Sequence, residues 1–165
     1  ALAGAFCFEG SAWLLFAAAL LCLVADVWIE HSLACGVLVF LGAHLCFICW
    51  MVLSGAMLGW NLLPAVLIAV FLLWGYRKYL RNIGPAAWFL AAYLPVLLSM
   101  TAVAFSLPFS SLGAGAWIAA TGAGMFACSD LLLGDAIITG RRKGKLVMLL
   151  YSPAVFLLAL SAFFF

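Results

Sequence analysis

Three polar side chains lie inside otherwise apolar stretches of the sequence, where they could carry out proton chemistry. They are Asp26, His44 and Asp130, and each belongs to a different stretch. Two carboxyl groups and an imidazole can together donate, accept and relay protons. Each residue alone could equally cap a neighbour or form a hydrogen bond in the core. Because the three occur together in a chain with 7% charged residues, we predict that they form a functional site and are its catalytic candidates.

Two further groups of side chains accompany this set. Tyr93 and Ser129 can form hydrogen bonds, and we predict them as substrate-binding residues. Cys46 and Cys49 form a C-x-x-C pair beside His44, but no second ligand pair follows at the spacing of a metal site. We expect the cysteines of the apolar stretches to pack as small hydrophobic residues. The sequence predicts no metal and no cofactor.

The elements that carry these residues must cross a lipid bilayer. Apolar residues make up 70% of the 165 residues, against roughly half in soluble domains. A membrane helix needs about 20 mostly apolar residues. Six stretches meet this requirement, at residues 11–29, 33–53, 60–76, 86–105, 112–134 and 146–165. Their continuous apolar runs lack the alternation of β-barrel strands, so we predict an all-α bundle of about six transmembrane helices.

The basic residues indicate how the helices are oriented. All seven lie in two loops, within residues 77–81 and 141–145, which six spans would place on the same side. The positive-inside rule puts these loops in the cytoplasm, and the protein in the inner membrane if the cell is bacterial. Short basic clusters at the membrane edge can contact membrane lipids. They are too few to predict a nucleic-acid partner.

The depths of the three catalytic candidates are compatible with a single site. Asp26 lies one turn before Glu30, about 6 Å inside the end of its helix. Asp130 stands at a similar depth before Asp135, and we expect Glu30 and Asp135 to be solvated at the span ends. His44 comes eleven residues after residue 33, about 16 Å from that helix start. The three side chains can therefore converge in the cytoplasmic half of the bundle.

Short loops join the predicted helices, so we expect one integral membrane domain over residues 1–165. The opening residues ALAGAFCF read as the tail of a further helix, which predicts an N-terminally truncated chain. Gly115, Gly122 and Gly124 would let another helix approach closely.

Four short motifs make the chain resemble a known family. Ala25-Asp26 ends one apolar helix, and FLGAHLCF places an aromatic residue on either side of His44. YLPVLLSM sets Tyr93 seven residues before a Met, and GAGMFACSDLLLG ends a small-residue run in Ser129-Asp130. In order, spacing and helix assignment, these motifs resemble those of the YhhN-like membrane proteins, which include the lysoplasmalogenases.

The chain also departs from the pattern of the family that it resembles. Ala25 stands where the family has Gly, Phe47 where it has Tyr, and Val155 where a polar amide is expected. The family has about eight helices, with a Lys-Pro motif in the second that is absent here. We attribute that absence to the expected N-terminal truncation.

The resemblance implies an enzyme that hydrolyses the vinyl ether bond of lysoplasmalogens to a fatty aldehyde and a glycerophospho-ethanolamine or -choline. An acid protonates the β-carbon, water captures the oxocarbenium ion, and the hemiacetal collapses. Two carboxyl groups and a His suffice for this chemistry without metal or organic cofactor. One of Asp26 and Asp130 would donate the proton, while the other acts with His44 on the cation and the water. The residues leave open which Asp does which.

Two other functions use the same kinds of residue. Intramembrane Asp and His also build proton relays, so a proton-coupled small-molecule transporter is the alternative. Asp26 and Asp130 lie towards one membrane face rather than at the midplane where carrier sites lie, which weighs against a transporter. A non-catalytic membrane scaffold is the third reading, and it predicts that both Asp residues tolerate replacement.

Overall fold

The computed structural model describes residues 12–81, 84, 86–110, 113–140 and 144–164, and these residues form an all-helical structure. The helices are α2 (Ala12–His31), α3 (Leu33–Leu53), α4 (Leu62–Leu80), α5 (Ala86–Ser110), α6 (Ala114–Thr139) and α7 (Gly144–Ser161). Each of these six described helices is long and apolar enough to cross a membrane. The prediction of a multi-pass, all-α bundle is therefore confirmed. The predicted truncation concerns residues that precede the described part.

These segments are helical because a bilayer offers the backbone no other hydrogen-bonding partner. Without water, each N–H and C=O group must pair inside its own segment. Large apolar side chains cover the outside of the bundle, such as Leu67, Phe71 and Phe156, and they are exposed where lipid tails would lie. Near the helix ends Trp28, Tyr79 and above all Trp60 (89% exposed) point outward, as aromatic residues at membrane interfaces commonly do.

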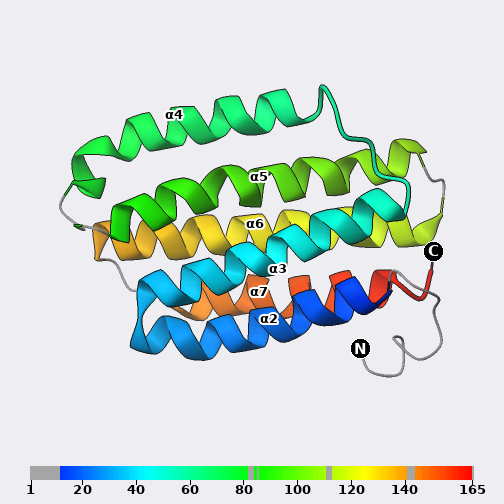
Figure 1. Cartoon of the computed structure of the whole chain (residues 1–165), viewed down its shortest axis with the longest axis horizontal. Helices are drawn as coiled ribbons and strands as arrows, with labels where there is room; N and C mark the ends of the chain where they lie inside the picture. Colours follow the sequence, from blue (N-terminus) through cyan, green and yellow to red (C-terminus); the bar gives the residue numbers. More distant parts are fainter. Residues whose placement is uncertain (1–11, 82–83, 85, 111–112, 141–143, 165) are drawn as a thin grey trace.

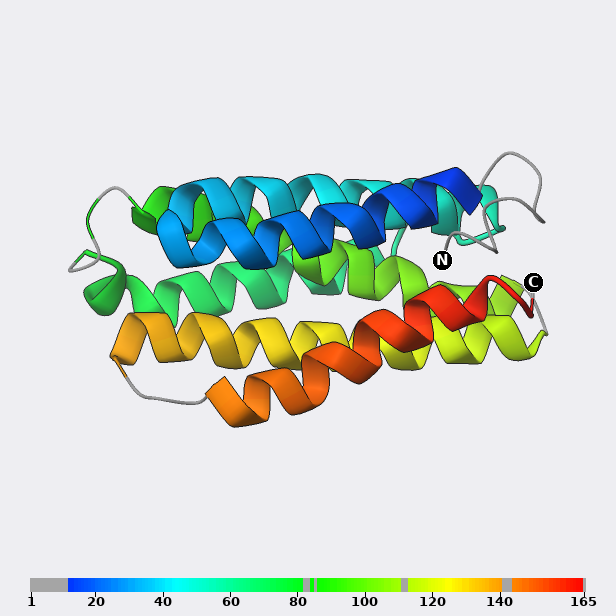
Figure 2. The ribbon, with the colours of Figure 1, turned by 90° about the horizontal axis from the view of Figure 1, so that it is seen from below.

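The helices run up and down beside one another, and consecutive helices are joined at alternating ends of the bundle (Figure 1). Helices α2 and α3 form one close pair and α6 and α7 another, while α5 packs between α3 and α6. Figure 2 shows the two pairs on opposite sides of the molecule. Helix α4 packs mainly on α5 and lies at the edge of the bundle, with Ala65 and Ala69 as its buried residues.

Close approach between helices depends on small residues. A Cβ atom on Gly36 of α3 would come within 2.7 Å of the Ile29 Cα atom on α2. A Cβ atom on Gly122 of α6 would lie 3.1 Å from the Ala154 carbonyl oxygen of α7. The expectation that Gly122 brings a second helix close is confirmed, and the same device joins α2 to α3.

Helix α6 extends further than its apolar stretch predicts. Ala136, Ile137 and Ile138 continue the apolar run after Asp135, and the helix ends at Thr139. Gly140 follows with a φ of +70°, a left-handed conformation that glycine adopts easily and that often terminates helices. The extension matters for the site, because it sets the depth of the two Asp residues on α6.

Candidate active site

His44 is held in a defined orientation at the centre of the bundle. Its side chain is fully buried on α3, and Nδ1 lies 2.7 Å from the Phe40 carbonyl oxygen one turn earlier. A carbonyl oxygen accepts hydrogen bonds but cannot donate them, so Nδ1 carries a proton. The other ring nitrogen, Nε2, lies 3.3 Å from the Tyr93 hydroxyl on α5. His44 is therefore oriented by its own helix and turned towards α5.

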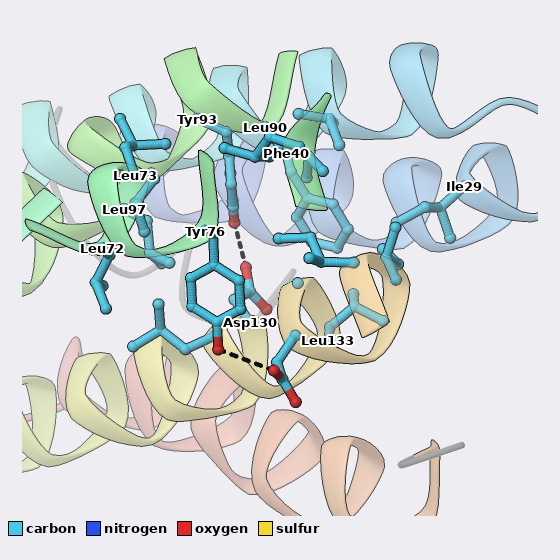
Figure 3. Close-up of a pocket in the computed structure, with 18 residues that line it drawn as sticks. Ile29, Phe40, Leu72, Leu73, Tyr76, Leu90, Tyr93, Leu97, Asp130 and Leu133 are labelled. Atoms are coloured by element: carbon cyan, nitrogen blue, oxygen red, sulfur yellow. Dashed lines mark hydrogen bonds between the residues drawn. The ribbon is translucent and has the colours of Figure 1, made fainter. Parts of the chain in front are cut away.

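The Tyr93 hydroxyl joins His44 to Asp130. It also donates a hydrogen bond to Oδ2 of Asp130 on α6, as Figure 3 shows. One phenol oxygen thus connects three helices through His44, Tyr93 and Asp130. Because Nδ1 already carries a proton, Nε2 can donate to this hydroxyl only when the ring holds a second proton, which could then pass through Tyr93 to Asp130. The arrangement is a hydrogen-bonded His–Tyr–Asp chain that ends at the Asp130 carboxyl group.

Asp26 belongs to a second carboxyl–phenol pair. Its Oδ2 atom accepts a hydrogen bond of 2.8 Å from the Tyr151 hydroxyl, which joins α2 to α7. The Tyr151 ring packs edge-on against Phe126 at 5.3 Å between ring centroids, and Phe126 packs against His44 at 5.0 Å. The structure therefore brings His44, Tyr93 and Asp130 into direct contact, and it connects Asp26 to them through packed rings.

An apolar cavity of about 180 Å³ opens beside Asp130, between α4, α5 and α6. Among the described residues that line it, four have polar side chains, namely Tyr76, Tyr93, Asp130 and Asp135. The remainder are mainly Leu, Ile and Val, with Phe40 from α3. Asp130 is partly exposed because it faces this space, whereas His44 is fully buried and is not among the described residues that line it. Of the predicted catalytic residues within the described chain, Asp130 is the one on the cavity wall.

Two further polar residues, Tyr76 and Asp135, line this cavity. Asp135, which the sequence places at a solvated span end, is half-buried beside this space. The Tyr76 hydroxyl donates a hydrogen bond of 2.9 Å to Asp135 Oδ1 and so ties α4 to α6. Asp135 is not at the end of its helix, because α6 continues four residues beyond it. Asp130 therefore lies about 13 Å from the end of the helix, deeper than one turn.

Ser129 stays a prediction as a substrate-binding residue, and the structure gives its hydroxyl a different contact. The side chain is fully buried and donates a hydrogen bond of 3.0 Å to the Val147 carbonyl oxygen of α7. It thereby links α6 to α7, and neither Ser129 nor any described residue of α7 lines the cavity. The sequence analysis did not identify Tyr151 as a site residue. Its hydrogen-bond partner Asp26 is distant along the chain, and no local sequence pattern predicts such a pair.

Together, the fold and the site define a polytopic α-helical membrane protein in which a hydrogen-bonded His–Tyr–Asp chain ends at an apolar cavity. The chain belongs to the YhhN family, whose family model matches residues 1–162. Comparison with curated proteins and with solved structures gave no match. The resemblance recognised in the four motifs is thus confirmed at the level of the family.

Proposed function

We propose that this protein is a lysoplasmalogenase-like hydrolase, which cleaves the vinyl ether bond of lysoplasmalogens. The products would be a fatty aldehyde and a glycerophospho-ethanolamine or -choline. The observation that carries the proposal is the position of Asp130. This carboxyl group lies on the wall of an apolar cavity and is hydrogen-bonded to Tyr93, which also meets His44. Membership of the YhhN family supports the proposal.

The cavity has the character expected for a single-chain lipid. Its wall is mostly aliphatic, and α4, which lines one side of it, has the smallest share of buried residues among the described helices. A lipid tail could therefore enter sideways from the bilayer between α4 and its neighbours. We also propose that the basic loops face the cytoplasm, so that the substrate comes from the cytoplasmic leaflet. In that case its polar head would remain at the basic end of the bundle.

The hydrogen-bonded chain of His44, Tyr93 and Asp130 suggests a division of roles for the reaction. Tyr93 is bonded to Oδ2 of Asp130, so the acid form of Asp130 would give its proton from Oδ1 to the β-carbon of the vinyl ether. The resulting carboxylate would stabilise the oxocarbenium ion and then take a proton from the attacking water. The hemiacetal would collapse to aldehyde and alcohol, with one water consumed overall. His44 would act through Tyr93 to hold or return the proton.

Asp26 receives a different role from the one assigned to Asp130. It lies outside the described cavity lining, so we propose it as a positioning residue rather than a group that touches the substrate. Its hydrogen bond holds Tyr151, and the Tyr151 ring supports Phe126 and Phe40, at 5.3 Å and 6.2 Å between centroids. Those rings in turn pack against His44.

The test is aldehyde release by the purified protein from a vinyl ether lysophospholipid. The saturated alkyl-ether analogue should release none, because it has no double bond to protonate. Asp130→Asn should lower kcat by about 10²- to 10⁴-fold, the usual contribution of a general acid. Glu30→Gln is the matched control, since Glu30 is an exposed acidic residue outside the cavity lining. Full activity of Asp130→Asn, or lipid flux in liposomes without aldehyde, would contradict the proposal.

A further inference from the structure

The cavity contains a second polar pair that the proposed reaction leaves unused. Tyr76 of α4 and Asp135 of α6 line the same space as Asp130 and are hydrogen-bonded to each other at 2.9 Å (Figure 3). They lie nearer to the basic end of the bundle, where the last turn of α4 carries Arg77 and Lys78. An ionisable residue inside a membrane bundle is a candidate for binding or catalysis.

We propose that Tyr76 and Asp135 form the subsite that binds the positively charged amine of the lipid head group. This inference rests on the proposed function, which supplies the lysophospholipid. A carboxylate forms strong charge-assisted hydrogen bonds with an ammonium group. The face of the adjacent Tyr76 ring also attracts a cation, including a quaternary one that has no N–H to donate. An anionic group would instead be repelled by Asp135.

The spacing of the two pairs matches the shape of such a lipid. On α6, Asp135 lies five residues beyond Asp130, which is about 7.5 Å nearer to the basic end. In a lysophospholipid, about nine bonds of roughly 1.5 Å each separate the ether oxygen from the amine nitrogen. When extended, this part of the lipid is longer than the distance of about 7.5 Å between Asp130 and Asp135 along α6, and a bent conformation matches that distance. A lipid with its ether group at Asp130 can therefore place its amine at Asp135.

The rest of the lipid finds compatible surroundings in the same orientation. Its phosphate would lie near the last turn of α4, where Arg77 and Lys78 supply positive charge outside the described cavity lining and the Arg77 guanidinium packs over Trp74 at 4.4 Å. Its alkyl chain would extend past Asp130 towards Leu72 and Leu97, which line the deeper part of the cavity. The head group then faces the basic end and the tail faces the bilayer interior, as in a lipid leaflet.

The experiment measures binding instead of turnover. The probes are saturated alkyl-ether lysophospholipids with an identical chain and either an ethanolamine or a glycerol head group, titrated onto the detergent-solubilised protein. The wild type should bind the ethanolamine lipid about tenfold more tightly, as expected for a hydrogen bond between charged groups. Asp135→Asn should remove this preference by weakening the binding of the ethanolamine lipid alone. Glu30→Gln removes the same charge as Asp135→Asn but outside the described cavity lining, so this variant should keep the preference for the ethanolamine lipid.

Equal binding of the two lipids by the wild type would overturn the subsite, and so would an unchanged preference in Asp135→Asn. An equal loss for both lipids would have the same consequence. If Asp135→Asn does not fold, Tyr76→Phe decides, because it removes the donor to Asp135 and should reduce the preference several-fold; an unchanged ratio overturns the subsite. The probes cannot be hydrolysed, so they report on binding alone. A protein that binds them selectively but releases no aldehyde from a vinyl ether lysophospholipid would contradict the proposed function and not the subsite.

Discussion

Tyr93 is the residue on which the proposed proton transfer depends, because its hydroxyl meets both His44 Nε2 and Asp130 Oδ2. Tyr93→Phe retains the ring and its packing against His44 but removes this connection. We expect kcat to fall by about 100-fold or more, with a loss of roughly 1 kcal/mol in stability. Steady-state kinetics and thermal unfolding in the same detergent would separate the two effects.

The control for this variant is Ser161→Ala. Ser161 is also fully buried, and its hydroxyl donates a hydrogen bond of 2.7 Å to Leu158, but it lies outside the described cavity lining. It should lose a similar amount of stability and keep kcat. A Tyr93→Phe protein that retains kcat while showing the same loss of stability as the control would reduce the Tyr93 hydroxyl to a structural role.

At the residue scale, the sequence was informative where a polar side chain is out of place. Asp26, His44 and Asp130 stand out because a charged or titratable group is costly in an apolar stretch. Tyrosine does not stand out in this way, because it is common both in protein cores and at the membrane interface. Tyr76 and Tyr151 could therefore not be assigned without the helix packing that turns them towards Asp135 and Asp26.

Helix pairs in this bundle depend on positions at which only glycine fits. Gly36→Ala would set a methyl group within 2.7 Å of the backbone of Ile29, so α2 and α3 must separate. We expect a loss of about 1–3 kcal/mol, the usual cost of overpacking. Gly75→Ala in α4 is the control, because a Cβ atom there meets nothing within 4 Å. Alanine at this helical position should be neutral or stabilising by up to about 1 kcal/mol.

Thermal unfolding of both variants in one detergent gives the comparison. A Gly36→Ala protein as stable as the wild type would show that α2 and α3 are not held together at this contact.

At the element scale, the sequence predicted which segments are helices and less well where they end. Long apolar runs identify six spans because a bilayer imposes both their length and their composition. The end of α6 was placed too early, since Asp135 reads as a polar boundary although Ile137 and Ile138 continue the run to Gly140. This difference explains why Asp135 lines the cavity and why Asp130 is deeper than expected.

On the scale of the whole molecule, the charge pattern predicts one orientation in the membrane. The ends of α4 and α6 and the starts of α5 and α7 lie together at one end of the bundle (Figure 1). With the basic loops in the cytoplasm, residues 54–61 between α3 and α4 must face the opposite side.

A membrane-impermeant thiol reagent tests this orientation in intact cells that produce a cysteine-free variant. A single cysteine at Gly59 should react, and one at Gly84 should react only after the membrane is permeabilised. The reverse labelling pattern would show that the protein has the opposite orientation. The proposed amine subsite would then lie on the other side of the membrane.

Hydrolysis in D₂O tests most directly whether Asp130 protonates a vinyl ether carbon. Protonation at the β-carbon leaves one solvent hydrogen on the carbon beside the aldehyde, which mass spectrometry of the product detects. We predict that the wild type releases aldehyde carrying one deuterium. Asp130→Asn should form it at least about 100-fold more slowly. Aldehyde without deuterium, no aldehyde from the wild type, or an unimpaired Asp130→Asn protein would contradict this role of Asp130.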